Sequence, residues 1–171
     1  MACNTSLTSI LKSCDNNVGG LTNFYVIPAE FVTGTTVTTG TVTNIGLSGG
    51  VFVEYQFNKN SAMYTEEAAI DLVNGSTFYT ETVKLTIPRR EAAKSQALML
   101  VGAGQRDLYI IVKDGNGLFW FVGYANKANL TGISEGSGTA KADGSKYTLT
   151  FLAEEPELMY EVDPAIIAGL L

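Results

Sequence analysis

The chain has 171 residues, of which 46% are hydrophobic and 16% are charged, and its formal net charge is −6. This length and composition predict a single folded domain over residues 1–171 and exclude a disordered chain. The acidic balance argues against a protein that grips nucleic acid, because phosphate contacts need clustered lysine and arginine side chains.

Residues 1–18 are predicted to form a short docking segment. Leu7, Ile10, Leu11 and Cys14 recur at spacings of three and four, which indicates a short helix or a docking turn. The first predicted strand follows at residues 21–27, which are apolar and rich in β-formers.

Residues 33–43 carry seven threonines and two glycines, and they have little apolar surface to bury. Because β-branched residues favour an extended backbone, this stretch is predicted to be a flexible arm, an edge strand, or a strand paired with another subunit. Residues 51–57 alternate strictly between two faces and predict a further strand.

A hairpin is expected next, although residues 63–73 contain both helix-forming and strand-forming residues. We favour a strand there, because Asn74-Gly75 follows at once and residues 78–87 can pair back across that turn.

The centre of the chain, residues 81–124, predicts a strand, a break, a helix and a tight hairpin. Pro88 ends the strand because it has no N–H to donate. Residues 89–101 are good helix formers closed by Gly102, and Asp114-Gly115 joins two apolar runs as a hairpin turn.

The last third is less regular. Residues 126–134 predict a weak strand, a glycine-rich loose loop that includes Gly132 and Gly136 comes next, and residues 146–152 predict a strand. Residues 154–163 are acidic and are expected to form a solvated or lumen-facing edge. The apolar tail, residues 164–171, is expected to dock on its own core or on a neighbouring subunit.

Cys3 and Cys14 do not have the spacing of a zinc site, and we expect two reduced thiols, with a disulfide as the alternative. The chain opens with no secretory signal pattern and has no apolar stretch of about 18 residues, so we expect synthesis in the cytoplasm and no membrane span.

No catalytic, cofactor-binding or metal site is predicted, and we expect no enzyme activity. Histidine, the commonest general base and metal ligand, does not occur in the chain. Gly102-Ala103-Gly104 follows a predicted helix instead of opening one, which rejects a dinucleotide fingerprint. Trp120 lies in a continuous apolar run, which is typical of a buried strand, although it is also a possible stacking platform for a sugar.

The order of these elements resembles that of bacteriophage tail-tube and tail-ring proteins, particularly those of phages that infect Bacteroidota, including the crAss-like group. The features that carry the resemblance are the start Gly19-Gly20-Leu21, the threonine-rich arm, the single helix at 89–101, the Asp114-Gly115 hairpin, and the turn Asp143-Gly144-Ser145 before residues 147–151.

The resemblance implies a mainly β fold, a β-sandwich or half-barrel with one flanking helix at about residues 89–101. It also implies a virion structural protein, assembled in the bacterial host, that forms a ring of roughly six or twelve copies with an acidic lumen for DNA. Residues 33–47 and 51–87 would then supply lumen or inter-ring contacts, and the other partners would be neighbouring tail or connector proteins. The alternatives are a carbohydrate- or cell-surface-binding β-sandwich, with Trp120 as its platform, and a capsid-decoration protein.

Overall fold

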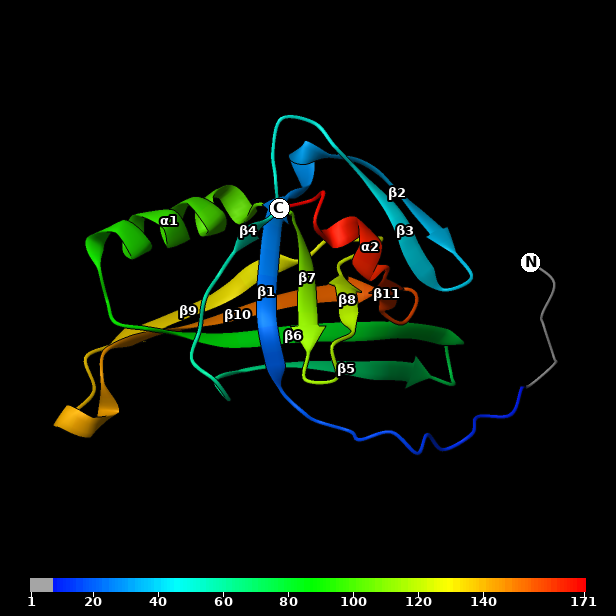
Figure 1. Cartoon of the computed structure of the whole chain (residues 1–171), viewed down its shortest axis with the longest axis horizontal. Helices are drawn as coiled ribbons and strands as arrows, with labels where there is room; N and C mark the ends of the chain where they lie inside the picture. Colours follow the sequence, from blue (N-terminus) through cyan, green and yellow to red (C-terminus); the bar gives the residue numbers. More distant parts are fainter. Residues whose placement is uncertain (1–7) are drawn as a thin grey trace.

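Two β-sheets and one flanking helix make up the computed structural model, which describes residues 8–171. The first sheet has seven strands in the order β2-β3-β11-β8-β7-β1-β4, and the second has four in the order β5-β6-β10-β9. In Figure 1 the strands of the first sheet run across those of the second, as in an orthogonal sandwich.

The strands of the first sheet are β1 (Leu21–Pro28), β2 (Val32–Thr38), β3 (Thr41–Leu47), β4 (Val53–Glu54), β7 (Leu108–Asp114), β8 (Phe119–Val122) and β11 (Tyr160–Val162). Those of the second sheet are β5 (Ala62–Asp71), β6 (Ser76–Pro88), β9 (Asn129–Gly136) and β10 (Lys146–Glu155). The helices are α1 (Ala92–Gly102) and the short α2 (Pro164–Ile167), and single 3-10 turns span Ala29–Phe31, Ala103–Gln105 and Lys141–Asp143.

The first core fills the space between the two sheets. Alternate residues of β1 and β7, including Phe24 and Val112, meet alternate residues of β6 and β10, including Val83 and Phe151. The rings of Phe24 and Phe151 lie 5.2 Å apart between centroids. Because side chains alternate along a strand, the remaining side chains of the second sheet point away from this core, and most of them are polar.

A second core covers the opposite face of the first sheet. Tyr25 and Ile27 of β1 pack there against Ile167 and Leu170 of the C-terminal tail. The Phe52 N–H donates a hydrogen bond of 2.8 Å to the Leu170 carbonyl. The apolar tail therefore docks on its own chain, which is the first of the two outcomes that its composition predicted.

Several predicted elements are confirmed. The strand at residues 21–27 is β1, residues 62–88 form the β5–β6 hairpin across Asn74-Gly75, and residues 108–122 form the β7–β8 hairpin. The threonine-rich stretch is the β2–β3 hairpin, with β2 at the edge of its sheet. The mainly β sandwich with one flanking helix, predicted at about residues 89–101 and observed at Ala92–Gly102, is also confirmed.

Other predictions are wrong. The strand at residues 51–57 shrinks to Val53–Glu54, because Phe52 turns into the second core while Tyr55 and Phe57 pack against the first. Residues 8–18 form no helix and are exposed, and Leu7 and Cys3 lie outside the described residues. The glycines at 132 and 136, expected in a loose loop, lie within β9.

Candidate functional site

The second sheet has two open edges, and they are the most distinctive feature of the chain. β5 pairs only with β6, and β9 pairs only with β10, among the described residues 8–171. A long edge strand with no partner presents a row of free backbone N–H and C=O groups, which another strand can use.

The free groups on β5 can be identified from the hydrogen-bond alternation. The Thr86 N–H donates to the Ser61 carbonyl at 2.9 Å, next to the paired residues Ala62 and Leu85. In an antiparallel ladder, hydrogen-bonded and non-hydrogen-bonded pairs alternate. The backbone groups that point to the open edge therefore belong to every second residue: Ala62, Tyr64, Glu66, Ala68 and Ile70.

The open edge of β9 also carries free backbone groups. The Arg89 N–H donates to the Ser145 carbonyl at 2.7 Å, which fixes the alternation between β6 and β10. The odd-numbered residues of β10 therefore bond to β6, and the even-numbered ones bond to β9. Ile133 and Glu135 stand opposite odd-numbered residues of β10, so their N–H and C=O groups point to the open edge of β9.

The two edges match in phase and in direction. The residues with free groups on β5 pair with the core-facing residues of β6, and Ile133 pairs with core-facing Leu149. A β5 strand joined to β9 would therefore continue the core-facing side of the sheet without a break. Because the four strands alternate in direction, β5 of an identically oriented copy is antiparallel to β9.

The face of the second sheet that points away from the core is a threonine surface. Its threonines come from three adjacent strands: Thr65, Thr80, Thr82, Thr86, Thr148 and Thr150. Its charged side chains are three carboxylates and two ammonium groups: Glu67, Asp71, Glu154, Lys84 and Lys146. Met63, Phe78 and Leu152 lie on the same face, which is otherwise polar with a slight excess of negative charge.

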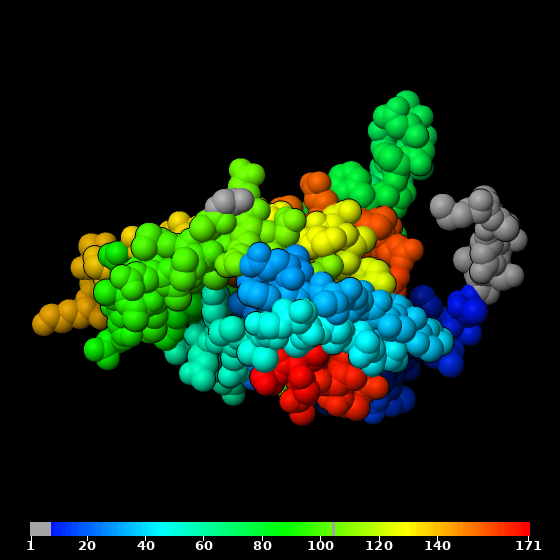
Figure 2. Space-filling view, turned by 90° about the horizontal axis from the view of Figure 1, so that it is seen from above, coloured from blue at the N-terminus to red at the C-terminus, as the bar shows by residue number. Residues whose placement is uncertain are grey.

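The β5–β6 hairpin stands clear of the rest of the molecule (green in Figure 2). Its turn carries Leu72 and Val73, whose exposed fractions are 90% and 94%. The carboxylate of Asp71 accepts hydrogen bonds from the Val73 and Asn74 N–H groups, and the Asn74 amide contact lowers the pKa of Asp71 most. The turn is therefore ordered locally and presents two apolar side chains to solvent.

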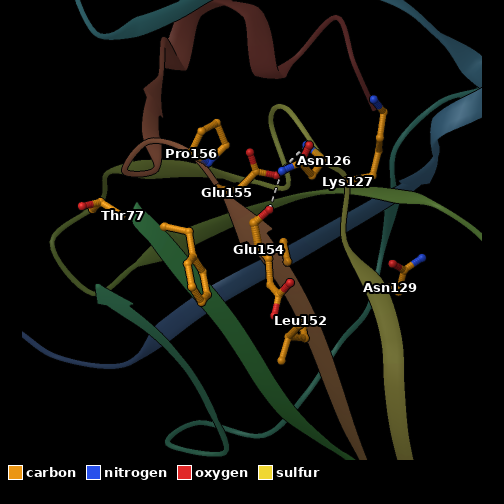
Figure 3. A pocket seen from close by; sticks show the side chains of 10 residues that line it. Thr77, Asn126, Lys127, Asn129, Leu152, Glu154, Glu155 and Pro156 are labelled. Carbon is orange, nitrogen blue, oxygen red and sulfur yellow. Dashed lines mark hydrogen bonds between the residues drawn. The ribbon is translucent and has the colours of Figure 1, made fainter. Parts of the chain in front are cut away.

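An open hollow of about 500 Å³ lies at the base of this hairpin (Figure 3). Thr77, Leu152, Asn129 and Lys127 line it, and the Asn126 side chain donates to the Glu154 carbonyl at 2.6 Å. Its lining is mixed, with Phe78, Leu152 and Pro156 beside the polar side chains, and Trp120 is not part of it.

Trp120 is half-buried against the first core, and its Nε1 donates to the Asp114 carboxylate at 3.1 Å. An indole held in this way packs the sandwich, as the apolar run around it predicted.

Two glutamates lie inside the protein, which the sequence did not predict. Glu81 and Glu155 are 1% and 2% exposed. For Glu155 this corrects the prediction that residues 154–163 form a solvated or lumen-facing edge. Glu155 accepts hydrogen bonds of 2.8 Å from the Ala125 and Asn126 N–H groups. Burial is the main cause that raises the pKa of both carboxyls. Alternation within β6 and β10 is the signal that would have found them, since both residues fall on the core-facing side.

Within residues 8–171, no group of three or more acidic, cysteine or histidine side chains is arranged to hold a metal ion. In the same part of the chain, no helix has the length and apolar character needed to cross a membrane. Cys14 lies exposed in the N-terminal segment.

The threonine-rich stretch and the strands after it are separated by the fold. Residues 33–47 belong to the first sheet, whereas β5 and β6 belong to the second. The chain matches no protein-family model, no curated protein and no solved structure.

Proposed function

We propose that this chain is a structural, non-enzymatic subunit of a homo-oligomeric ring in a bacteriophage tail, and that the ring conducts DNA. The observation that carries the proposal is the pair of open edges of the second sheet, which match in phase and direction. The resemblance in element order to tail-tube and tail-ring proteins gives the assembly its biological setting.

Ring closure follows from the geometry of a head-to-tail contact. When β5 of each copy pairs with β9 of the next, the same heterologous interface repeats around the assembly, and a suitable rotation closes it. Closure into a barrel removes every free edge of the second sheet. The sheet twist and the curvature of the barrel set the number of copies.

In this ring the threonine surface lines the lumen, and the first sheet and α1 lie outside. Hydroxyl groups and the small excess of carboxylates give DNA no cluster of cations to bind, so phosphates pass without strong retention. This assigns the lumen to β5, β6, β9 and β10. The β2–β3 hairpin, with residues 33–47, falls on the outer wall.

The projecting β5–β6 turn and the exposed N-terminal segment would contact the next ring or a neighbouring tail or connector protein. Leu72 and Val73 at the turn, and Ile10 and Leu11 in the segment, are exposed apolar side chains. Such side chains are more stable when a partner covers them.

The proposal is tested by Ala68→Pro, which removes an N–H that points to the open edge and leaves the β5–β6 hydrogen bonds in place. Proline is tolerated at such an edge position. We expect the wild-type chain to form rings, seen by mass measurement and negative-stain microscopy, and we expect Ala68→Pro to remain monomeric with an unchanged circular dichroism spectrum.

Ala68→Ser is the matched control, because it changes the same exposed side chain but keeps the N–H. It should form rings as the wild type does. Rings of undiminished stability in Ala68→Pro, or a wild-type chain that is monomeric at every concentration, would contradict the proposal.

A further inference from the structure

Helix α1 runs along β9 on the core-facing side of the second sheet. Near one end Arg90 forms an ion pair with Glu135, with 2.9 Å between Nη2 and Oε2. At the other end Gly102 lies against Leu130. The helix therefore follows the edge strand for most of its length (Figure 1).

An open hollow of about 190 Å³ lies between α1 and β9. It is lined by residues of the helix, of β9 and of β10: Ser95, Leu98, Met99, Ile133, Glu135 and Tyr147. Of these, Leu98 and Tyr147 are buried, but Met99 is 63% exposed and Ile133 is 45% exposed. The chain's own atoms thus leave two apolar side chains of the hollow in contact with water.

We infer that this hollow receives the β5 strand of a second copy, so that α1 clamps the joint between two subunits. The inference rests on the proposed function and deepens it, because it assigns a second surface to the same interface. One layer of the joint is the backbone pairing of β9 with β5, and the other is apolar packing under α1.

The edge groups of both strands belong to residues that face the core side of the sheet. The edge groups of β9 belong to Ile133 and Glu135, which face the core side where α1 lies. The edge groups of β5 also belong to core-facing residues, so a paired β5 turns those side chains toward α1.

The dimensions agree with this placement. A helix with its side chains is about 10 Å across, whereas adjacent strands lie about 4.8 Å apart. A helix laid along the last strand of a sheet therefore overhangs the position of the next strand.

The β5 strand has apolar surface to offer on this side. Ala68 and Ile70 are core-facing by register but exposed in the single chain, because this end of β5 belongs to the projecting hairpin (Figure 2). The outer half of β5 and the hollow beside β9 are thus two incompletely covered apolar surfaces, which the joined sheet brings to the same side.

Met99→Lys tests the inference, and Leu100→Lys is its matched control. Leu100 is 65% exposed on the same helix but does not line the hollow. Placing a lysine at position 99 should raise the midpoint concentration of assembly by about tenfold, because it replaces a buried thioether with a charge at the joint. Leu100→Lys should change the midpoint by less than about twofold.

The outcomes separate this inference from the proposed function. Equal midpoints for the two lysine variants, together with loss of rings in Ala68→Pro, would overturn the clamp and leave the edge pairing intact. A wild-type chain that never assembles would overturn both. A two-subunit particle that ignores Met99→Lys would instead indicate pairing of β5 with β5, which also overturns the clamp.

Discussion

At the residue scale, Glu81 occupies the least favourable environment for a charged group. Its side chain lies between the two sheets, and its carboxylate accepts one hydrogen bond of 2.9 Å from the Gly123 N–H. Burial, followed by the nearby carboxylates of Glu155 and Glu66, raises the pKa of Glu81 to about 8. The folded protein therefore holds a proton there at neutral pH.

This pKa shift makes stability depend on pH. The unfolded chain releases the proton near pH 4.5 and the folded chain near pH 8, so the stabilisation is complete below about pH 4.5 and is lost as the pH rises toward 8. Glu81→Gln removes this titration and keeps an acceptor for the Gly123 N–H. We expect it to raise the free energy of unfolding at pH 8 by about 1–3 kcal/mol.

Urea unfolding of both proteins at several pH values between 5 and 8 measures the effect. Glu154→Gln is the control, because Glu154 is the neighbour of Glu155 on the exposed face, and it should change the unfolding free energy by less than about 0.5 kcal/mol. If the free energy of unfolding of Glu81→Gln varies with pH in parallel with that of the wild type, Glu81 does not govern the pH dependence of stability.

At the scale of elements, the C-terminal tail is part of the fold rather than an adhesive end. Ile167 and Leu170 close the second core, and Asp163 caps α2 by accepting the Ala165 N–H at 2.9 Å. The tail's apolar composition is therefore explained within a single chain, and the proposed assembly rests on the open strand edges alone.

Leu170→Ala should lower the free energy of unfolding by about 2–4 kcal/mol, because it leaves a cavity in the second core. Leu171→Ala changes a half-exposed side chain next to it and should cost less than about 0.5 kcal/mol. Denaturant titration measures both values. A similar loss in both variants would mean that the docking of Leu170 adds no specific stability.

Local patterns predicted the elements whose partners are near in sequence. The Asn74-Gly75 turn predicted the β5–β6 hairpin, and Asp114-Gly115 predicted the β7–β8 hairpin, because tight turns fix the register of adjacent strands. Distant pairings were not predictable: β11 lies parallel to β3, and its two partner strands are far away in the chain. No periodicity within residues 160–162 specifies such neighbours.

The candidate site was predicted only in part. The sequence indicated strands that seek partners and named residues 33–47 and 51–87. The second range contains the open edge strand β5, whereas β9, the other open edge, lies outside both ranges. Edge position depends on sheet order, which is a property of the whole fold. The burial of Glu81 and Glu155 was missed for a related reason, since a carboxylate on a strand is normally taken to face solvent.

At the scale of the whole molecule, several features bear on the one interface that we propose. The second sheet has a core-facing side, a threonine side and two complementary edges, and α1 lies beside one of those edges. A free chain would expose these edges to unspecific pairing, which natural proteins avoid. In the proposed ring, pairing between identical copies would use them instead.

Hydrogen exchange on the assembled and the dissociated protein examines this interface amide by amide. Assembly should slow exchange at Ile133 and Glu135 of β9, and at those edge residues of β5 that pair with them, which belong to the set Ala62, Tyr64, Glu66, Ala68 and Ile70. Edge amides of β2, which the proposed ring places on its outer wall, should exchange at the same rate in both states. Assemblies in which the β5 and β9 edge amides exchange as fast as in the single chain would contradict the edge-paired ring.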